Sequence, residues 1–326
     1  MFNTTGDSFW IDEHNTLWRV FFQDETVKKQ ENLEIKNITH VAGGKDHIVV
    51  VGENGRCWGI GNNHDGQLSG GTFTYTNEFE RIYGIDNVLK VAVGSRNTVF
   101  LDCNGTVWAC GDNNSNQILS NHFARVFSPT IVAGLPECTA ISAGPECIYA
   151  VDVDGAVWLT GNANTVNYTE FSVSDNTLPR KLNFETPIES ISANDNTCLF
   201  ASVDGRTLWR AFAKRACTKS FFEEGIKQIS AFSYRSIVLD GAGTLWACDN
   251  LDAEFKPFPL PNNELVSFIY PSTTNILYLC TMEGTGYALF LNQWSLFRKI
   301  AFSFKFVPLD LSNAYAKTQT KSARKG

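Results

Sequence analysis

The feature that most constrains this fold is a pattern that returns seven times along the chain, in full or in part. Its fullest copy is residues 41–68, VAGGKDHIVVVGENGRCWGIGNNHDGQL, and residues 91–118 align with it without a gap. Short apolar runs of β-forming residues alternate with glycine- and asparagine-rich turns, which predicts a small antiparallel meander. Such a meander cannot bury a core alone, so we expect the copies to pack against one another.

An aromatic residue marks the same position in every copy. The markers are Trp18, Trp58, Trp108, Trp158, Trp209, Trp246 and Tyr287, with spacings of 40, 50, 50, 51, 37 and 41 residues. A solenoid would have tighter, more regular periods and polar caps at both ends. A WD-repeat propeller would show tryptophan followed by aspartate, and no tryptophan here precedes an aspartate. We therefore predict an all-β, seven-bladed β-propeller.

Both ends of the chain contribute to the predicted ring. Residues 9–18 contain only the second half of a copy, and residues 299–303, KIAFS, are similar to residues 90–94, KVAVG. We predict that these terminal segments together complete the first blade, because closing the ring removes exposed strand edges. Residues 1–312 would form one propeller domain. Residues 313–326 would be a flexible basic tail, since chain ends are usually poorly ordered.

The other blades are expected at residues 38–68, 88–118, 138–162, 188–210, 226–249 and 265–289. We interpret residues 22–36 as a charged link, and we expect the later connectors to hold the outer strands and the face loops. Residues 163–187 begin with an asparagine- and serine-rich stretch without strand pattern. This connector is the best place for a projecting loop, the alternative being an ordinary outer strand with flanking turns.

Two copies end in a distinctive motif. Residues 61–68, GNNHDGQL, fit G-x-N-x-x-G-Q-L in full, and residues 111–118, GDNNSNQI, fit it with Asn116 in place of the second glycine. Together with the D-x-x-G-x-V-W turns, these residues resemble the regulator of chromosome condensation repeat family over roughly residues 5–310. The resemblance implies a β-propeller. For the nucleotide-exchange members of that family, it also implies a face that grips a small GTPase and distorts its nucleotide site.

Composition narrows the partners and the compartment. The net charge of −7 argues against binding nucleic acid through the bulk surface. The first ten residues lack the features of a signal peptide, and no apolar run approaches the ~20 residues of a membrane helix. The nine cysteines are odd in number and lack C-x-x-C pairing, which favours buried free thiols over zinc binding or catalysis. We expect a cytoplasmic or nuclear protein.

No enzymatic chemistry can be placed on the sequence. The loop at residues 61–66 lacks the following Lys-Ser/Thr of a phosphate-binding loop. Residues 152–155, DVDG, resemble the start of a calcium loop, but the later ligands are missing, so we interpret them as a turn with a left-handed glycine. The five histidines have no evident acid or base partner. We predict no metal, no cofactor and no hydrolytic or redox site, with nucleotide exchange as the most activity the chain could have.

The loop that leads into the second strand of each blade varies most between copies. Radial symmetry gathers these loops on one face, near the central channel. They supply the candidate partner-binding residues Asp46, His47, Arg96, Asn97, Glu146, Asp195, Tyr234 and Arg235. The alternative is that these side chains only cap turns and line the channel. By the family resemblance, Asp46, His47, Glu146 and Asp195 match the acidic residues and the histidine that act in exchange.

The sequence thus predicts a protein-interaction platform that binds a protein partner through this face. The sharper form of the prediction is guanine-nucleotide exchange on a Ran-like or Rab-like GTPase, by stabilising the nucleotide-free state without covalent chemistry. Two alternatives remain open from the residues. One is a structural subunit of a larger complex, and the other is an inhibitor that plugs an enzyme's active site with the propeller face.

Overall fold

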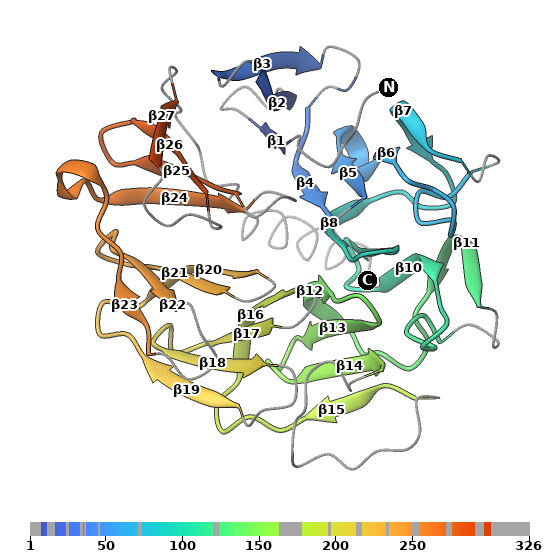
Figure 1. Ribbon diagram of the computed structural model, residues 1–326. Helices are drawn as coiled ribbons and strands as arrows, with labels where there is room; N and C mark the ends of the chain where they lie inside the picture. Colours follow the sequence, from blue (N-terminus) through green and yellow to red (C-terminus); the bar gives the residue numbers. More distant parts are fainter. Residues whose placement is uncertain are drawn as a thin grey trace, which may run out of the picture.

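The structure is a computed structural model of the chain. It describes residues 8–11, 17–23, 26–32, 35, 37–44, 46–70, 74–119, 124–162, 178–194, 197–212, 217–232, 235–248, 254–271, 276–290 and 297–300. These residues form 27 strands and two single 3₁₀ turns, η2 (Glu53–Gly55) and η4 (Pro261–Asn263). The strands form small sheets around a common centre, so the prediction of an all-β propeller is confirmed (Figure 1).

Six antiparallel sheets of four consecutive strands form six blades, each named here by its strands. The β4–β7 blade consists of β4 (His40–Gly43), β5 (His47–Val51), β6 (Cys57–Gly61) and β7 (Thr76–Ile82). The β8–β11 blade consists of β8 (Val88–Val93), β9 (Asn97–Asp102), β10 (Val107–Asp112) and β11 (Arg125–Ile131). The β12–β15 blade consists of β12 (Cys138–Ala143), β13 (Cys147–Asp152), β14 (Val157–Gly161) and β15 (Arg180–Leu182). The β16–β19 blade consists of β16 (Ile188–Ala193), β17 (Thr197–Ser202), β18 (Thr207–Phe212) and β19 (Thr218–Phe221). The β20–β23 blade consists of β20 (Ile226–Phe232), β21 (Arg235–Asp240), β22 (Leu245–Cys248) and β23 (Lys256–Pro257). The β24–β27 blade consists of β24 (Val266–Pro271), β25 (Ile276–Thr281), β26 (Gly286–Phe290) and β27 (Phe297–Ile300).

The N-terminal residues form a smaller sheet between the β4–β7 and β24–β27 blades (Figure 1). It has three strands in the order β1 (Ser8–Ile11), β2 (Leu17–Gln23) and β3 (Thr26–Asn32). The described residues therefore form six complete blades and this three-stranded sheet, and not seven complete blades. The interpretation of residues 22–36 as a link is wrong in part, because β3 lies within them and pairs with β2.

The predicted ring closure is wrong for the two of its residues that the structure describes. Lys299 and Ile300 lie in β27, where they pair with Tyr287 and Gly286 of β26. They therefore belong to the outer strand of the last blade, and they do not pair with β1. The rest of the predicted closing segment and the tail at residues 313–326 lie outside the described residues.

The repeat copies correspond to the first three strands of each blade, and the connectors supply the fourth. β15 lies in the connector at residues 163–187, whose asparagine- and serine-rich part, residues 163–177, lies outside the described residues. The second strands β5, β9, β13 and β17 are buried along their whole length. The core consequently lies between blades: for example, Val49 and Phe100 of neighbouring blades share one cluster.

A carboxylate explains the D-x-x-G-x-V-W pattern. Asp152 Oδ1 accepts hydrogen bonds from the backbone N–H groups of Asp154 at 3.0 Å and Ala156 at 2.8 Å. Its Oδ2 accepts one from Trp158 Nε1 at 2.8 Å. The same aspartate–tryptophan bond recurs in two other blades, at 3.0 Å and 2.7 Å. Asp152 therefore holds a tight turn to its tryptophan, as the turn interpretation of residues 152–155 predicted.

Replacing Asp152 by alanine is expected to lower the free energy of unfolding by about 2–3 kcal/mol. The change removes three hydrogen bonds to a buried carboxylate and leaves the Trp158 N–H without its acceptor. The matched control is Asp154→Ala in the same turn, where the side chain is exposed and a change of about 0.5 kcal/mol or less is expected. Urea denaturation of both variants measures the difference. Equal losses would contradict this account of the turn.

The innermost strands are joined to one another around the ring. At each of five boundaries, a side chain on the inner strand of one blade forms a hydrogen bond with the backbone of the inner strand of the next blade. These bonds are His40 Nε2 with the Val91 carbonyl at 3.1 Å, Lys90 Nζ to the Thr139 carbonyl at 3.1 Å, Ala193 N–H to Ser142 Oγ at 2.9 Å, Ala231 N–H to Ser192 Oγ at 2.9 Å, and Ile269 N–H to Gln228 Oε1 at 2.9 Å. This belt spans five successive boundaries and fixes the loops at the strand ends relative to one another.

Candidate functional site

The two faces of the ring are built from different loops. We call one the signature face: it holds the loops between first and second strands and those between third and fourth strands, which include the G-x-N-x-x-G-Q-L motifs. We call the other the turn face: it holds the turns between second and third strands and the connections to the next blade. All the predicted partner-binding residues that the structure describes belong to loops or strand starts of the signature face.

The motif at residues 61–68 folds through its own amide side chains. Asn63 Oδ1 accepts the backbone N–H of Leu68 at 2.9 Å, and Gln67 Oε1 accepts that of Asp65 at 2.9 Å. The motif thus needs these residue types because each amide oxygen satisfies a backbone donor inside a tight loop. The loop holds its side chains in one arrangement.

The second motif, residues 111–118, folds in the same way. Asn113 Oδ1 accepts the backbone N–H of Ile118 at 2.8 Å. Asn116, which stands where the first motif has Gly66, adopts φ +57°, against +83° for the glycine. Asparagine tolerates this left-handed conformation better than other non-glycine residues, so the partial motif retains the loop.

Each motif also clasps the next blade. The Gln67 carbonyl accepts a hydrogen bond from Thr98 Oγ1 at 2.6 Å, and Thr98 in turn bonds His47 Nε2 at 2.9 Å. The Gln117 carbonyl likewise accepts a bond from Thr160 Oγ1 at 2.5 Å. These two motif loops are therefore fastened across the blade boundaries.

Three predicted residues occupy equivalent places on this face. The carbonyls of Asp46, Arg96 and Glu146 accept backbone N–H bonds from a residue at, or directly after, the end of the third strand of the same blade, at 2.8, 2.9 and 3.0 Å. These shared bonds use only the backbone, so the side chain at this place can differ from blade to blade. Arg96 is exposed, whereas Asp46 and Glu146 are half-buried. Glu146 accepts a second bond from the side-chain amide of Asn162 at 2.9 Å.

The other predicted residues are placed differently. His47 and Asn97 begin second strands and are 1% and 0% exposed, so their side chains pack between blades. Burial lowers the pKa of His47 to about 3, which keeps the ring neutral. Arg235 is half-buried at the start of β21. Asp195 and Tyr234 lie outside the described residues.

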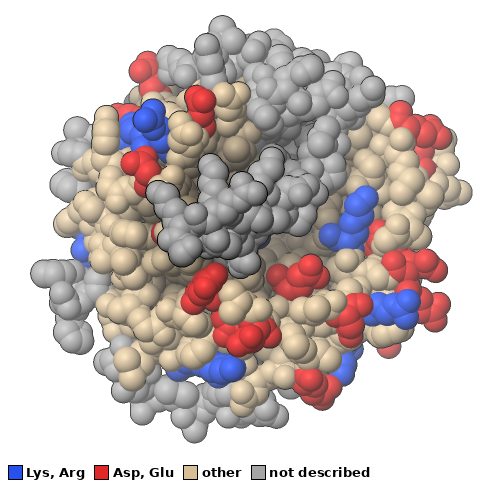
Figure 2. All heavy atoms as spheres, turned by 180° about the vertical axis from the view of Figure 1, so that it is seen from behind, with Lys and Arg blue, Asp and Glu red and all other residues tan. Residues whose placement is uncertain are grey.

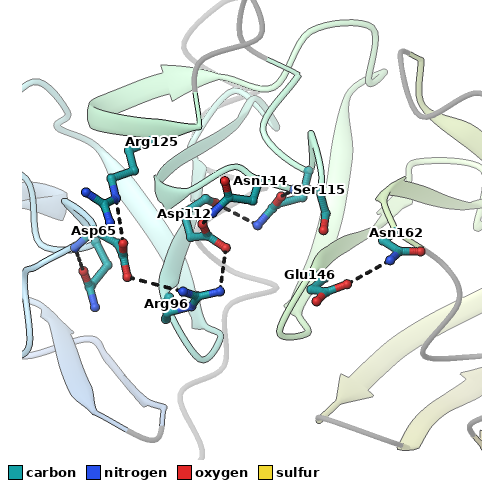
Figure 3. A network of polar contacts seen from close by, with 10 residues as sticks. Asp65, Arg96, Asp112, Asn114, Ser115, Arg125, Glu146 and Asn162 are labelled. Atoms are coloured by element: carbon teal, nitrogen blue, oxygen red, sulfur yellow. Dashed lines mark hydrogen bonds and ion pairs between the residues drawn. The ribbon is translucent and has the colours of Figure 1, made fainter.

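A chain of alternating charges crosses the boundary between the β4–β7 and β8–β11 blades (Figure 3). Arg125 Nε lies 2.8 Å from Asp65 Oδ1, and Arg96 NH1 lies 4.0 Å from Asp65 Oδ2. Arg96 NH2 lies 3.3 Å from Asp112 Oδ2, and the amide of Asn114 also bonds Asp112. We call Arg125, Asp65, Arg96 and Asp112 the arginine network.

The two signs of charge in the arginine network differ in depth. The side chains of Arg96 and Arg125 are 49% and 52% exposed, whereas those of Asp65 and Asp112 are 9% and 1% exposed. The buried carboxylates orient the guanidinium groups, and the surface presents the guanidinium edges. Sequence reasoning missed Asp65 and Asp112, although both lie at variable positions of the two motifs. Arg125 lies in a connector without a repeat pattern, so no sequence signal marked it.

One exposed aromatic side chain packs next to the arginine network, and a second lies before β7. Phe127 is 43% exposed and lies two residues after Arg125 on β11. Its ring packs on Gly66, where an added Cβ would lie 2.6 Å from Phe127 Cδ1. Tyr75, before β7, is 36% exposed. Arginine and aromatic side chains on a rigid support are typical of the residues that dominate protein–protein binding.

The turn face has a different character (Figure 2). Its exposed acidic residues are Glu53, Asp86, Glu137, Asp154, Glu185, Asp204, Glu223, Glu224 and Glu283. Its exposed basic residues are Arg56, Arg206 and Lys227. The turn face is therefore acidic, and the signature face carries the ordered mixed-charge network.

In the described part of the chain, no cluster of three or more His, Cys, Asp or Glu side chains is arranged to hold a metal ion. No helix in the same residues is long and apolar enough to cross a membrane. All nine cysteines are free thiols and seven are buried, as predicted. Burial raises the pKa of Cys57 to about 12, so it is a packing residue.

Two of the repeat copies match a known family. Residues 38–67 and 88–117, which contain all but the last residue of each motif, match the model of the regulator of chromosome condensation (RCC1) repeat. These two copies are regulator of chromosome condensation repeats. A search of curated sequences finds no match.

Solved structures share the propeller at low sequence identity. Human WBSCR16 aligns with a TM-score of 0.69 and 16% identity over 85% of this chain and 84% of its own. Prp20p from Saccharomyces cerevisiae, described with its binding to Gsp1p and histones, aligns with a TM-score of 0.67 and 16% identity over 81% and 78%. Yeast RCC1 (Prp20), solved with Kap60, gives 0.68 and 15% over 83% and 77%. At these identities the likeness establishes the fold alone.

Proposed function

We propose that this repeat propeller is a protein-recognition module that binds its partner through the signature face. The observation that carries the proposal is the arginine network, in which two half-exposed guanidinium groups are held by two buried carboxylates. Preorganised side chains lose little conformational entropy on binding, so they contribute more of their interaction energy to affinity. The bonds to the Gln67 and Gln117 carbonyls likewise hold the two motif loops to the next blade.

We further propose that the partner is a small GTPase and that binding promotes release of its nucleotide. The support is the repeat family together with a structural neighbour that is described by its binding to Gsp1p. Asp46 and Glu146 flank Arg96 at equivalent places on the signature face, where the family resemblance places acidic contacts. Asp195, Tyr234 and Arg235 remain part of the proposed surface. His47 and Asn97 would support it from beneath.

A binding experiment tests the face as well as the function. Immobilised full-length protein is exposed to a panel of nucleotide-free small GTPases, and association is measured by biolayer interferometry. We expect at least one GTPase to bind, and the Asp46→Ala/Glu146→Ala variant to bind at least tenfold more weakly. The matched control is Glu223→Ala/Glu224→Ala, which removes two acidic side chains from the turn face and is expected to bind like the wild type.

Each outcome decides a different claim. If no GTPase of the panel binds, the GTPase proposal is wrong. If one binds and the turn-face variant is the weaker of the two, the signature face is not the recognition surface. Melting temperatures of both variants, measured alongside, show that the loss of binding does not come from unfolding.

We also infer that the β1–β3 sheet is the seventh blade of a closed ring. Its three strands match the second, third and fourth strands of the other blades, because the marker Trp18 lies in β2 as the other markers lie in third strands. A chain ending at Ile300 is expected to melt at a lower temperature if the residues beyond it complete this blade. An unchanged melting temperature would contradict closure by the C-terminal segment.

A further inference from the structure

Resting on the proposed function, we infer that the partner places an acidic side chain, followed by an apolar one, against Arg96, Arg125 and Phe127. These three residues form what we call the acid-binding patch. The acid-binding patch presents positive charge to the partner. It differs in this from the loop residues Asp46 and Glu146 on the same face, which are acidic.

The first support is the orientation of charge. The arginine network contains two cations and two anions, so its total charge is zero. Its carboxylates are shielded at 9% and 1% exposure, while its guanidinium groups are about half exposed. A partner at this surface therefore meets the positive ends of an oriented arrangement, with the negative ends behind them (Figure 3).

The second support is the donor geometry. Arg125 meets Asp65 through Nε at 2.8 Å, so its two terminal nitrogens are not used in that contact. Arg96 uses one terminal nitrogen at 3.3 Å from Asp112 and the other at 4.0 Å from Asp65, the second being a loose contact. Guanidinium groups bind carboxylates through paired N–H donors, so both arginines retain donors for an incoming carboxylate.

The third support is the apolar neighbour. Arg125 and Phe127 lie on either side of the buried Val126 on β11, and both side chains are exposed. Phe127 is 43% exposed and rests on the Gly66 backbone, which fixes the ring beside the guanidinium groups. An apolar partner residue packed on this ring would exclude water from the neighbouring charge pair and strengthen it.

The net charge of the chain does not explain such a preference. At −7 the whole molecule repels acidic partners at long range. The expected recognition is therefore local. It should weaken with added salt, and it should depend on the two arginines individually.

The test uses a random dodecapeptide library displayed on phage and the full-length protein. Peptides are selected on the wild type after removal of those that bind the variant Asp65→Asn/Arg96→Gln/Asp112→Asn/Arg125→Gln, which deletes all four network charges together and leaves no buried carboxylate unpaired. We expect the recovered peptides to be enriched in Asp or Glu followed by an apolar residue. The best peptide and its Asp→Asn or Glu→Gln form are then compared by fluorescence polarisation, with an expected loss of at least tenfold.

Single variants locate the contact. Arg96→Ala and Arg125→Ala are each expected to weaken the acidic peptide at least tenfold, and Arg96→Lys less than Arg96→Ala. Arg206→Ala on the turn face is the matched control and is expected to have no effect. Recovery of basic or uncharged peptides that need Asp46 or Glu146 would overturn the acidic preference while leaving protein recognition by this face intact. The acidic preference would also be overturned if the acidic peptide and its amide form bound equally well. The same holds if the arginine variants bound the acidic peptide as tightly as the wild type does.

Discussion

Replacing Gly111 by alanine is expected to destabilise the protein by about 3 kcal/mol or more and to displace the Arg96 loop. Gly111 begins the second motif with φ +110°, a conformation that side chains rarely adopt, and the strain alone costs about 1–3 kcal/mol. A Cβ at this position would lie 2.4 Å from the Arg96 carbonyl oxygen, which accepts the Asp112 N–H. Because the oxygen is a backbone atom and the position of Cβ is fixed by the backbone, the loop must move to relieve this clash.

The matched control is Gly284→Ala on the turn face. Gly284 has φ +83°, but an added Cβ would meet no atom within 4 Å. It therefore carries the backbone strain without the clash, and a loss of about 1 kcal/mol is expected. Urea denaturation compares the two variants, and peptide or GTPase binding reports on the loop. Equal destabilisation would show that the contact with the Arg96 loop does not matter.

The second large effect is a loss of stability in mild acid that depends on His47. Burial lowers its pKa in the folded protein to about 3, from the ordinary value of 6.5 that applies once the chain unfolds. Below pH 6.5 the unfolded chain binds a proton that the folded protein does not, so acid favours unfolding. The stabilisation is complete above pH 6.5 and is lost as the pH falls toward 3. Between pH 6.5 and 4.5 the expected loss from this residue is about 2–3 kcal/mol.

The repeat itself supplies the control for this prediction. The next blade has Asn97 at the position of His47, so His47→Asn should be accommodated without a titratable group. Denaturation curves between pH 7.5 and 4.5 should be flatter for this variant than for the wild type. Some acid sensitivity should remain, because burial and the nearby Lys90 lower the pKa of His40 to about 4. An unchanged pH dependence would contradict the assignment to His47.

The fold could be predicted because its strongest signals are local. The Asp152 turn and its tryptophan lie within one copy, and each copy repeats the same short-range hydrogen bonds. β3 was missed because its sequence, TVKKQEN, is polar and lacks the apolar pattern of an inner strand. Lys299 and Ile300 were misplaced because a five-residue similarity to an inner strand says nothing about which neighbour a strand pairs with.

The candidate site could be predicted only in part, for a related reason. Repeat register brings Asp46, Arg96 and Glu146 to equivalent places on one face, and this follows from the sequence. One residue further along, a side chain points between blades, which is why His47 is buried although it adjoins an exposed loop. The contacts of Asp65 with Arg96 and Arg125 cross a blade boundary. Such contacts depend on how two blades meet, and a single sequence does not give that geometry.

The most direct test of the account is the rate of mant-GDP release from a panel of small GTPases, with and without this protein. We predict faster release from at least one GTPase, with the acceleration lost in Asp46→Ala/Glu146→Ala and retained in Glu223→Ala/Glu224→Ala. No acceleration for any GTPase of the panel, or acceleration that survives the signature-face change, would contradict exchange through the signature face.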